Sequence, residues 1–183
     1  IMPLENLSTL THLDLSQNTL FSLWPINALN NLIALKVSHN KDVEAFDLHP
    51  MISNNPHLRI LGLAGIPLDR LSDLPFTTSP PFNHYQLTEL DISQTGINDL
   101  FGLQNFHELK HLNIAGNNLS LLGGSDFPPT LEHLDLRNNR LDHLNEALNL
   151  TQLKALYVSG NSQLEFADVD PIIRNNPFLQ HLG

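Results

Sequence analysis

Apolar residues recur along the chain in an eleven-position pattern, LxxLxLxxNxL, whose first copy begins at Leu10. In each copy the apolar residues at the fourth and sixth positions alternate with polar ones, which is the period of two expected of a half-buried β-strand. In the first copy, Leu13 and Leu15 would therefore face a core, while His12 and Asp14 would face solvent. The pattern predicts one short strand per copy, with one solvent-exposed face.

The pattern occurs seven times in complete form and an eighth time in truncated form. The copies begin at residues 10, 32, 58, 87, 109, 131, 153 and 179, so that successive starts lie 22, 26, 29, 22, 22, 22 and 26 residues apart. A unit this short cannot close a core alone and must bury its apolar side against its neighbours. We therefore expect a single solenoid domain over residues 1–183. Because the chain starts and stops inside repeats, we also expect a native protein that is longer at both ends.

This repeat resembles that of leucine-rich-repeat (LRR) proteins, and 22-residue copies such as LTELDISQTGINDLFGLQNFHE at 87–108 are similar to the internalin-like class of bacterial proteins. The resemblance implies an α/β solenoid, a right-handed superhelix or horseshoe arc. Its concave side would be a parallel β-sheet of about eight short strands, and its convex side would hold loops, 3₁₀ turns and two short helices. It also implies a protein–protein interaction module that binds through the concave sheet face.

Prolines in the two 26-residue copies predict the two helices. Residues 32–62 align without gaps on residues 153–183, with 16 of 31 positions identical, so this segment is interpreted as a duplicated block. Both copies carry one proline inside an apolar run, at Pro50 and Pro171, and another before the next strand, at Pro56 and Pro177. Proline fits the first turn of a helix and disfavours helix in the residue before it. We therefore predict convex helices over residues 50–54 and 171–175.

An asparagine follows most of the predicted strands, at positions 18, 40, 117, 139 and 161. Its amide can bond backbone groups of adjacent turns, so we expect a stacked ladder of side-chain amides. Ile66 and Thr95 occupy the same position in the third and fourth copies, where the ladder should be interrupted. The 29-residue copy contains an insertion at 74–86, which is interpreted either as a bulge on the rim or as a binding loop anchored by Phe82 and Tyr85.

The solvent-facing strand positions are the candidate binding residues, because in-register neighbours on this face lie only about 4.8 Å apart. Aromatic and arginine side chains dominate interface energies, so Tyr157, Arg137, Lys36 and Ile60 are the expected anchors. The full candidate set is His12, Asp14, Lys36, Ile60, Glu89, Asp91, His111, Asn113, His133, Asp135, Arg137 and Tyr157.

Two other kinds of site could be built from residues on the same face. Glu89, His111 and His133 are a carboxylate and two imidazoles on successive strands, but parallel strands aim such side chains alongside each other, so a solvated polar ladder is favoured over a metal site. His12, Asp14 and Ser16 lie about 6.6 Å apart along one strand, beyond hydrogen-bond reach. We expect no catalytic residues, no metal site and no cofactor.

Composition narrows the partner and the setting. The net charge of -10 argues against nucleic acid and suggests a protein partner with a basic patch. The chain has no cysteine and no apolar run of membrane-spanning length, so a cytoplasmic or bacterial secreted or surface setting is favoured over a disulfide-rich extracellular one. The predicted function is therefore non-catalytic binding, for example by a bacterial effector or surface protein that recognises a host protein. The alternative is a substrate-recognition or spacer arm of a larger multidomain protein, including an enzyme whose catalytic domain lies elsewhere.

Overall fold

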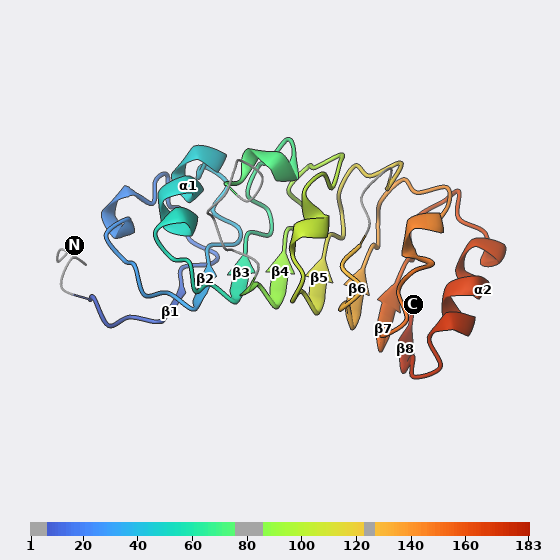
Figure 1. The fold of residues 1–183 in the computed structure, drawn as a ribbon. Helices are drawn as coiled ribbons and strands as arrows, with labels where there is room; N and C mark the ends of the chain where they lie inside the picture. The colour runs from blue at the N-terminus through green and yellow to red at the C-terminus, as the bar shows by residue number, and fades with distance from the viewer. Residues whose placement is uncertain (1–6, 76–85, 123–126) are drawn as a thin grey trace.

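A computed structural model describes residues 7–75, 86–122 and 127–183, and within them the chain forms one parallel sheet of eight strands in chain order. The strands follow one side of an elongated solenoid, and the helices and turns cover the other side (Figure 1). The strand bounds are β1 His12–Asp14, β2 Ala34–Lys36, β3 Ile60–Gly62, β4 Glu89–Asp91, β5 His111–Asn113, β6 His133–Asp135, β7 Ala155–Tyr157 and β8 His181–Leu182. The predicted LRR-type solenoid is confirmed.

Equivalent repeat positions face one another across the sheet. His12 pairs with Ala34, Ala34 with Ile60 and Ile60 with Glu89. The same register continues to β8, so each position of the repeat forms a straight row of side chains across the strands. The middle residue of each strand from β1 to β7, such as Leu35, is an apolar residue that packs in or against one continuous core.

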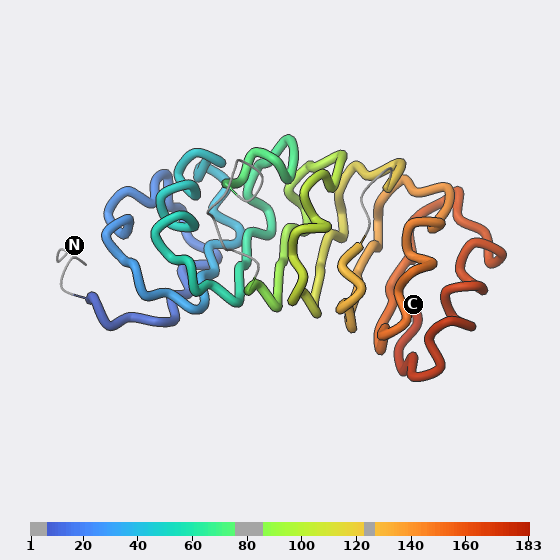
Figure 2. Tube along the Cα trace, in the orientation of Figure 1, coloured from blue at the N-terminus to red at the C-terminus, as the bar shows by residue number. Residues whose placement is uncertain are grey.

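Each successive coil of the chain stacks on the one before it, as the tube in Figure 2 shows. The coils return on the side opposite the sheet through one-turn 3₁₀ helices at Trp24–Ile26, Leu71–Asp73, Leu103–Asn105 and Asn145–Ala147. The two 26-residue copies instead return through α-helices, α1 at Ala45–Ser53 and α2 at Phe166–Asn175.

The prediction of where these helices begin was wrong. Both start five residues earlier than expected, and Pro50 and Pro171 lie inside them rather than in the first turn. An acidic residue at the third helical position fixes each start. The Glu44 N–H donates to Asp47 Oδ2 at 3.2 Å, and the Glu165 N–H donates to the corresponding oxygen of Asp168 at 2.8 Å. Proline then costs its helix one internal hydrogen bond without ending it.

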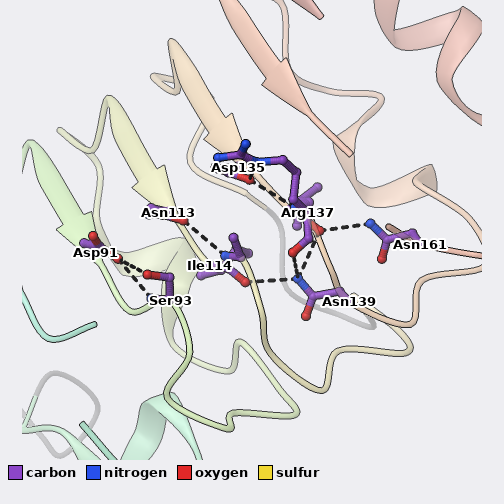
Figure 3. A network of polar contacts seen from close by, with 10 residues as sticks. Asp91, Ser93, Asn113, Ile114, Asp135, Arg137, Asn139 and Asn161 are labelled. Carbon is purple, nitrogen blue, oxygen red and sulfur yellow. Dashed lines mark hydrogen bonds and ion pairs between the residues drawn. The ribbon is translucent and has the colours of Figure 1, made fainter. Parts of the chain in front are cut away.

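A ladder of asparagine side chains joins the coils where the strands end (Figure 3). Asn139 Nδ2 donates to the carbonyls of Leu136, in its own repeat, and Ile114, in the preceding one, both at 3.0 Å. Its Oδ1 accepts the Leu119 N–H at 3.2 Å, so one side chain satisfies three buried backbone groups. Asn161 repeats the donor pair on the next coil.

The predicted interruption of the ladder is confirmed at Ile66, whose side chain is fully buried in the core. At Thr95 the interruption is also confirmed, because among the described residues the Thr95 side chain bonds only within its own repeat and to Asn117 of the next one, and not to the preceding coil. The Thr95 hydroxyl lies 2.9 Å from the Ile92 carbonyl oxygen, which also accepts a hydrogen bond from Asn117 Nδ2 at 2.9 Å. A threonine hydroxyl therefore replaces part of the missing amide.

The residue just before each ladder position has left-handed backbone geometry in all seven complete repeats. Gln17, His39, Gln94 and Asn138 have φ between 54° and 59°, and the three remaining positions are Gly65, Gly116 and Gly160. From the second repeat onward, repeats with a long side chain at this position alternate with repeats that have glycine there. Each long side chain lies over the glycine of the next repeat. A Cβ added at Gly160 would clash with Asn138 Oδ1. Side-chain size therefore alternates along this row.

Candidate partner-binding face

A shallow groove of about 320 Å³ runs across the solvent face of the sheet from β2 to β7. It brings together nine of the twelve candidate residues, namely Lys36, Ile60, Glu89, Asp91, His111, Asn113, His133, Asp135 and Tyr157. His12 and Asp14 lie on β1, and Arg137 follows β6, so these three lie outside its lining. Phe82 and Tyr85 of the insertion lie outside the described residues.

The polar residues at the ends of the strands have a structural role that sequence reasoning missed. Asp91 Oδ1 accepts the Ser93 N–H at 3.0 Å and the Ser93 hydroxyl at 2.7 Å (Figure 3). Asn113 Oδ1 accepts the N–H two residues on, at 3.1 Å, in the same way. Asp14 and Asp135 do so too, and the Ser16 N–H is the main reason that the pKa of Asp14 is lowered. These side chains therefore close the turn after each strand, which fixes their direction on the face.

Arg137 is held against the sheet by two neighbours. Its guanidinium forms a bidentate ion pair with Asp135, with Nε 2.9 Å from Oδ1 (Figure 3). The same group lies over the ring of Tyr157, 5.1 Å from its centroid. The carboxylate of Asp135 raises the pKa of Arg137 above its usual value. The three side chains form a pre-organised, nearly neutral cluster at the β6–β7 end of the groove.

The candidate metal cluster does not form. His111 and His133 stack face to face, with ring centroids 4.3 Å apart and planes 10° from parallel, so the two imidazoles lie alongside each other. Within the described residues, no group of three His, Cys, Asp or Glu side chains could hold a metal ion. Burial lowers the pKa of His133, and the nearby His111 lowers it further. His133 therefore favours the neutral imidazole.

A row of alternating charge beside the groove was also missed. Glu132 lies between Lys110 and Lys154, with Oε1 3.1 Å from Lys110 Nζ and Oε2 2.5 Å from Lys154 Nζ. The hydrogen bonds from Lys154 and then Lys110 lower the pKa of Glu132 to about 2. The signal was available in the sequence, since the three residues occupy the same repeat position at intervals of 22.

Comparisons with known proteins support the fold seen here. The Leucine Rich Repeat family model matches residues 130–150. Two crystal structures of Listeria monocytogenes proteins resemble the chain: an internalin (inlF), with a TM-score of 0.81, 24% identity and coverage of 98% of this chain and 49% of that one, and internalin C2, with a TM-score of 0.78, 22% identity and coverage of 97% and 75%.

Among curated proteins, Toll-like receptor 2 of Macaca fascicularis is 31% identical over 165 residues, and that of Homo sapiens is 30% identical. These matches cover 90% of this chain, which spans 18% of the length of either receptor.

The single sheet with one strand per coil, the asparagine ladder and these similarities define the class. The chain has a leucine-rich-repeat fold, and its residues 130–150 match the family model. Its fold is typical of protein–protein interaction modules. No helix within the described parts of the chain has the length and apolar character needed to cross a membrane.

Proposed function

We propose that the chain is a non-catalytic interaction module that binds a protein partner in the groove on its sheet face. The observation that carries the proposal is that this groove crosses six strands and gathers nine candidate side chains, while the described helices and turns pack on the other side of the solenoid. Fixed aromatic and polar groups beside an open groove are typical of protein recognition surfaces.

The charge of the face favours a partner with a basic patch. Glu89, Asp91 and Asp135 line the groove, whereas Lys36 is the one cation among its lining residues, and the chain as a whole carries a net charge of -10. Complementary charge would speed encounter and fix orientation, while Tyr157, held under Arg137, would supply a rigid anchor.

The fold shared with the Listeria internalins supports a bacterial surface, secreted or effector protein that recognises a host protein. A second role, as a recognition or spacer arm of a larger multidomain protein, is supported by the length of the Toll-like receptors, of which the chain spans 18%.

The proposal can be tested by charge reversal in the groove. Proteins captured by the immobilised wild-type chain are purified. The affinity of each for the wild-type chain and for a variant carrying Asp91→Lys and Asp135→Lys is then measured by calorimetry. We expect a true partner to bind the groove variant at least about tenfold more weakly, because two attractive contacts become repulsive.

Asp42→Lys is the matched control, because Asp42 is exposed on a turn outside the groove and the substitution makes the same kind of charge change. It should leave the affinity unchanged. Equal binding of a purified partner to the wild-type chain and to the groove variant would exclude the groove as its binding site.

A further inference from the structure

A small pocket of about 220 Å³ lies between α1 and the 3₁₀ helix Trp24–Ile26, away from the sheet (Figure 1). Three aromatic residues line it, Phe21 and Trp24 from the first coil and Phe46 from the first turn of α1. All three are exposed, by 81%, 74% and 67% respectively, so they form an apolar patch around the pocket. Because drug-sized sites begin at roughly 300 Å³, this pocket fits one small chemical group. We call it the aromatic pocket.

The fold does not require the three rings of the aromatic pocket. The block that contains α2 repeats the same architecture 121 residues later, where the equivalent positions hold Asp142, Asn145 and Ala167. The chain there forms the same one-turn 3₁₀ helix and the same α-helix with a proline inside it. Since polar and small residues serve at these positions, the packing of the coils does not explain the rings.

A carboxylate also lines the aromatic pocket. Asp47 is buried, with 9% of its surface exposed. Its Oδ1 accepts the Ser22 hydroxyl at 3.0 Å, and its Oδ2 accepts the Glu44 N–H at 3.2 Å. Among the described residues, no lysine, arginine or histidine forms an ion pair with Asp47, and none lines the pocket. The charge of this carboxylate is therefore not neutralised from within the pocket.

The rings and the carboxylate together favour a cation that donates no hydrogen bonds. The face of an aromatic ring carries negative potential and attracts positive charge, most strongly for tryptophan. A primary ammonium or a guanidinium would lose its water to apolar walls, and both oxygens of Asp47 already accept hydrogen bonds. A quaternary ammonium has no N–H group to satisfy and presents methyl groups to the rings, so it suits both features.

We propose that the aromatic pocket binds a trimethylammonium group of the choline type. The methyl groups would pack against the three rings, and Asp47 would contribute charge rather than a hydrogen bond. The side-chain amide of Asn27, which also lines the pocket, can bond the hydroxyl of choline. This site is separate from the groove on the sheet face, so the proposal stands or falls independently of the proposed function.

The fluorescence of Trp24 provides the test, because this residue is the one tryptophan of the chain. Titration with choline at constant chloride should change the fluorescence with a dissociation constant of roughly 1 mM, since so small a ligand makes few contacts. The neutral carbon analogue of choline, 3,3-dimethylbutan-1-ol, should bind at least about tenfold more weakly, and so should ethanolamine, a primary ammonium. No response to choline, or equal binding of either control ligand, would overturn the proposal.

Substitution of two rings locates the binding site. Phe21→Ala and Phe46→Ala should each weaken choline binding roughly three- to fivefold, and both variants should fold because the rings are exposed. Phe166→Ala is the matched control, because Phe166 is a similarly exposed ring in the first turn of α2 and lies outside the pocket. It should bind choline as the wild type does. Full affinity in both pocket variants would refute the proposal.

Asp47→Asn tests the contribution of charge. This variant should bind choline roughly fivefold more weakly and bind the neutral analogue unchanged. Asp168→Asn makes the same change at the start of α2, where Asp168 accepts the Glu165 N–H at 2.8 Å, and should leave choline affinity unchanged. Equal losses for choline and its neutral analogue would show that Asp47 acts through shape and not charge. If Asp47→Asn does not fold, the two phenylalanine variants still decide the proposal.

A trimethylammonium group could reach the pocket on free choline or on the head group of a phosphatidylcholine membrane. We expect the free ligand, because the phosphate of a lipid would lie near Asp47 and the exposed Glu44. Cosedimentation with phosphatidylcholine vesicles separates the two sources. Choline binding without cosedimentation would support the free ligand. Cosedimentation that is lost in Phe46→Ala would overturn free choline as the source and assign the same chemistry to the lipid.

Discussion

His111 and His133 stack with their ring centroids 4.3 Å apart. At this distance a positive charge on one ring opposes a charge on the other. The two side chains occupy the same position of adjacent strands, so the register of the sheet holds them together. The stack makes the centre of the groove sensitive to acid.

The first prediction concerns the pH dependence of stability. Because burial and His111 lower the pKa of His133, the unfolded chain binds more protons than the folded one at pH values between the two pKa values. The free energy of unfolding should therefore fall as the pH drops below about 6.5, the ordinary histidine value. Urea unfolding of the wild type and of His133→Gln at several pH values checks this. A pH dependence equally steep in the variant would show that His133 is not its source.

The second prediction concerns the row formed by Lys110, Glu132 and Lys154. Glu132→Gln should lower the free energy of unfolding at neutral pH by about 1 kcal/mol, since the lysines are half exposed and solvent screens their attraction. The Glu132 pKa is depressed from 4.5 to about 2, so the stabilisation is complete above pH 4.5 and is lost as the pH falls through 2.

Chemical unfolding in low and high salt measures this effect, which should shrink in high salt. Asp170→Asn is the control, because it removes only the single exposed pair with Arg174 and should cost at most about 0.5 kcal/mol. If Glu132→Gln lowers the free energy of unfolding no more than Asp170→Asn does, the row stabilises the chain no more than an isolated ion pair.

The third prediction concerns the asparagine ladder. Asn139→Ala leaves the buried Leu119 N–H without a partner and removes one of the two asparagine bonds at each of the Ile114 and Leu136 carbonyls, so it should destabilise the chain by about 2 kcal/mol. Asn18 occupies the same position in the first repeat but is exposed, so water can replace its bonds, and Asn18→Ala should cost under about 1 kcal/mol. Thermal and urea unfolding of both variants provide the comparison, and similar losses would contradict the burial argument.

The fourth prediction separates backbone strain from steric clash at two glycines. Gly160→Ala would place a methyl group against Asn138 at a residue with φ of 80°, and should cost about 2–3 kcal/mol. Gly96 has φ of 92°, but an added methyl group would meet only the Leu68 carbonyl oxygen at 3.4 Å, so Gly96→Ala should cost about 1 kcal/mol from strain alone. The loss of unfolding free energy caused by Gly160→Ala, minus the loss caused by Gly96→Ala, measures the clash. This difference would vanish if Asn138 could move aside freely.

The strands and their register could be predicted because they depend on spacing alone. Leucines with a period of two can face only one core, and 22-residue steps place equivalent residues side by side. The helix starts could not be predicted from proline alone, since Glu44 and Asp47 bond locally and initiate α1 upstream of Pro50. The interruption of the ladder at Thr95 could be predicted, but not that its hydroxyl keeps the bond to the carbonyl oxygen three residues earlier.

The rows of the candidate site could be predicted, but not the contacts within them. Spacing places Asp135, Arg137 and Tyr157 near one another, whereas the bidentate ion pair and the guanidinium over the ring depend on rotamers. The stack of His111 and His133 likewise replaces the convergent geometry that a metal would need. That the candidate residues bind a partner remains a prediction.

The alternation of long side chains and glycine at the left-handed turns limits how such a solenoid can change its length. His39 lies over Gly65, Gln94 over Gly116 and Asn138 over Gly160, so the repeats are matched in twos. Deleting residues 109–130 alone would bring Gln94 and Asn138 to adjacent coils with no glycine between them. Deleting residues 87–130 would remove a matched pair and keep the alternation. From the second repeat onward along this row, a change of length by two repeats keeps the alternation, whereas a change by one repeat does not.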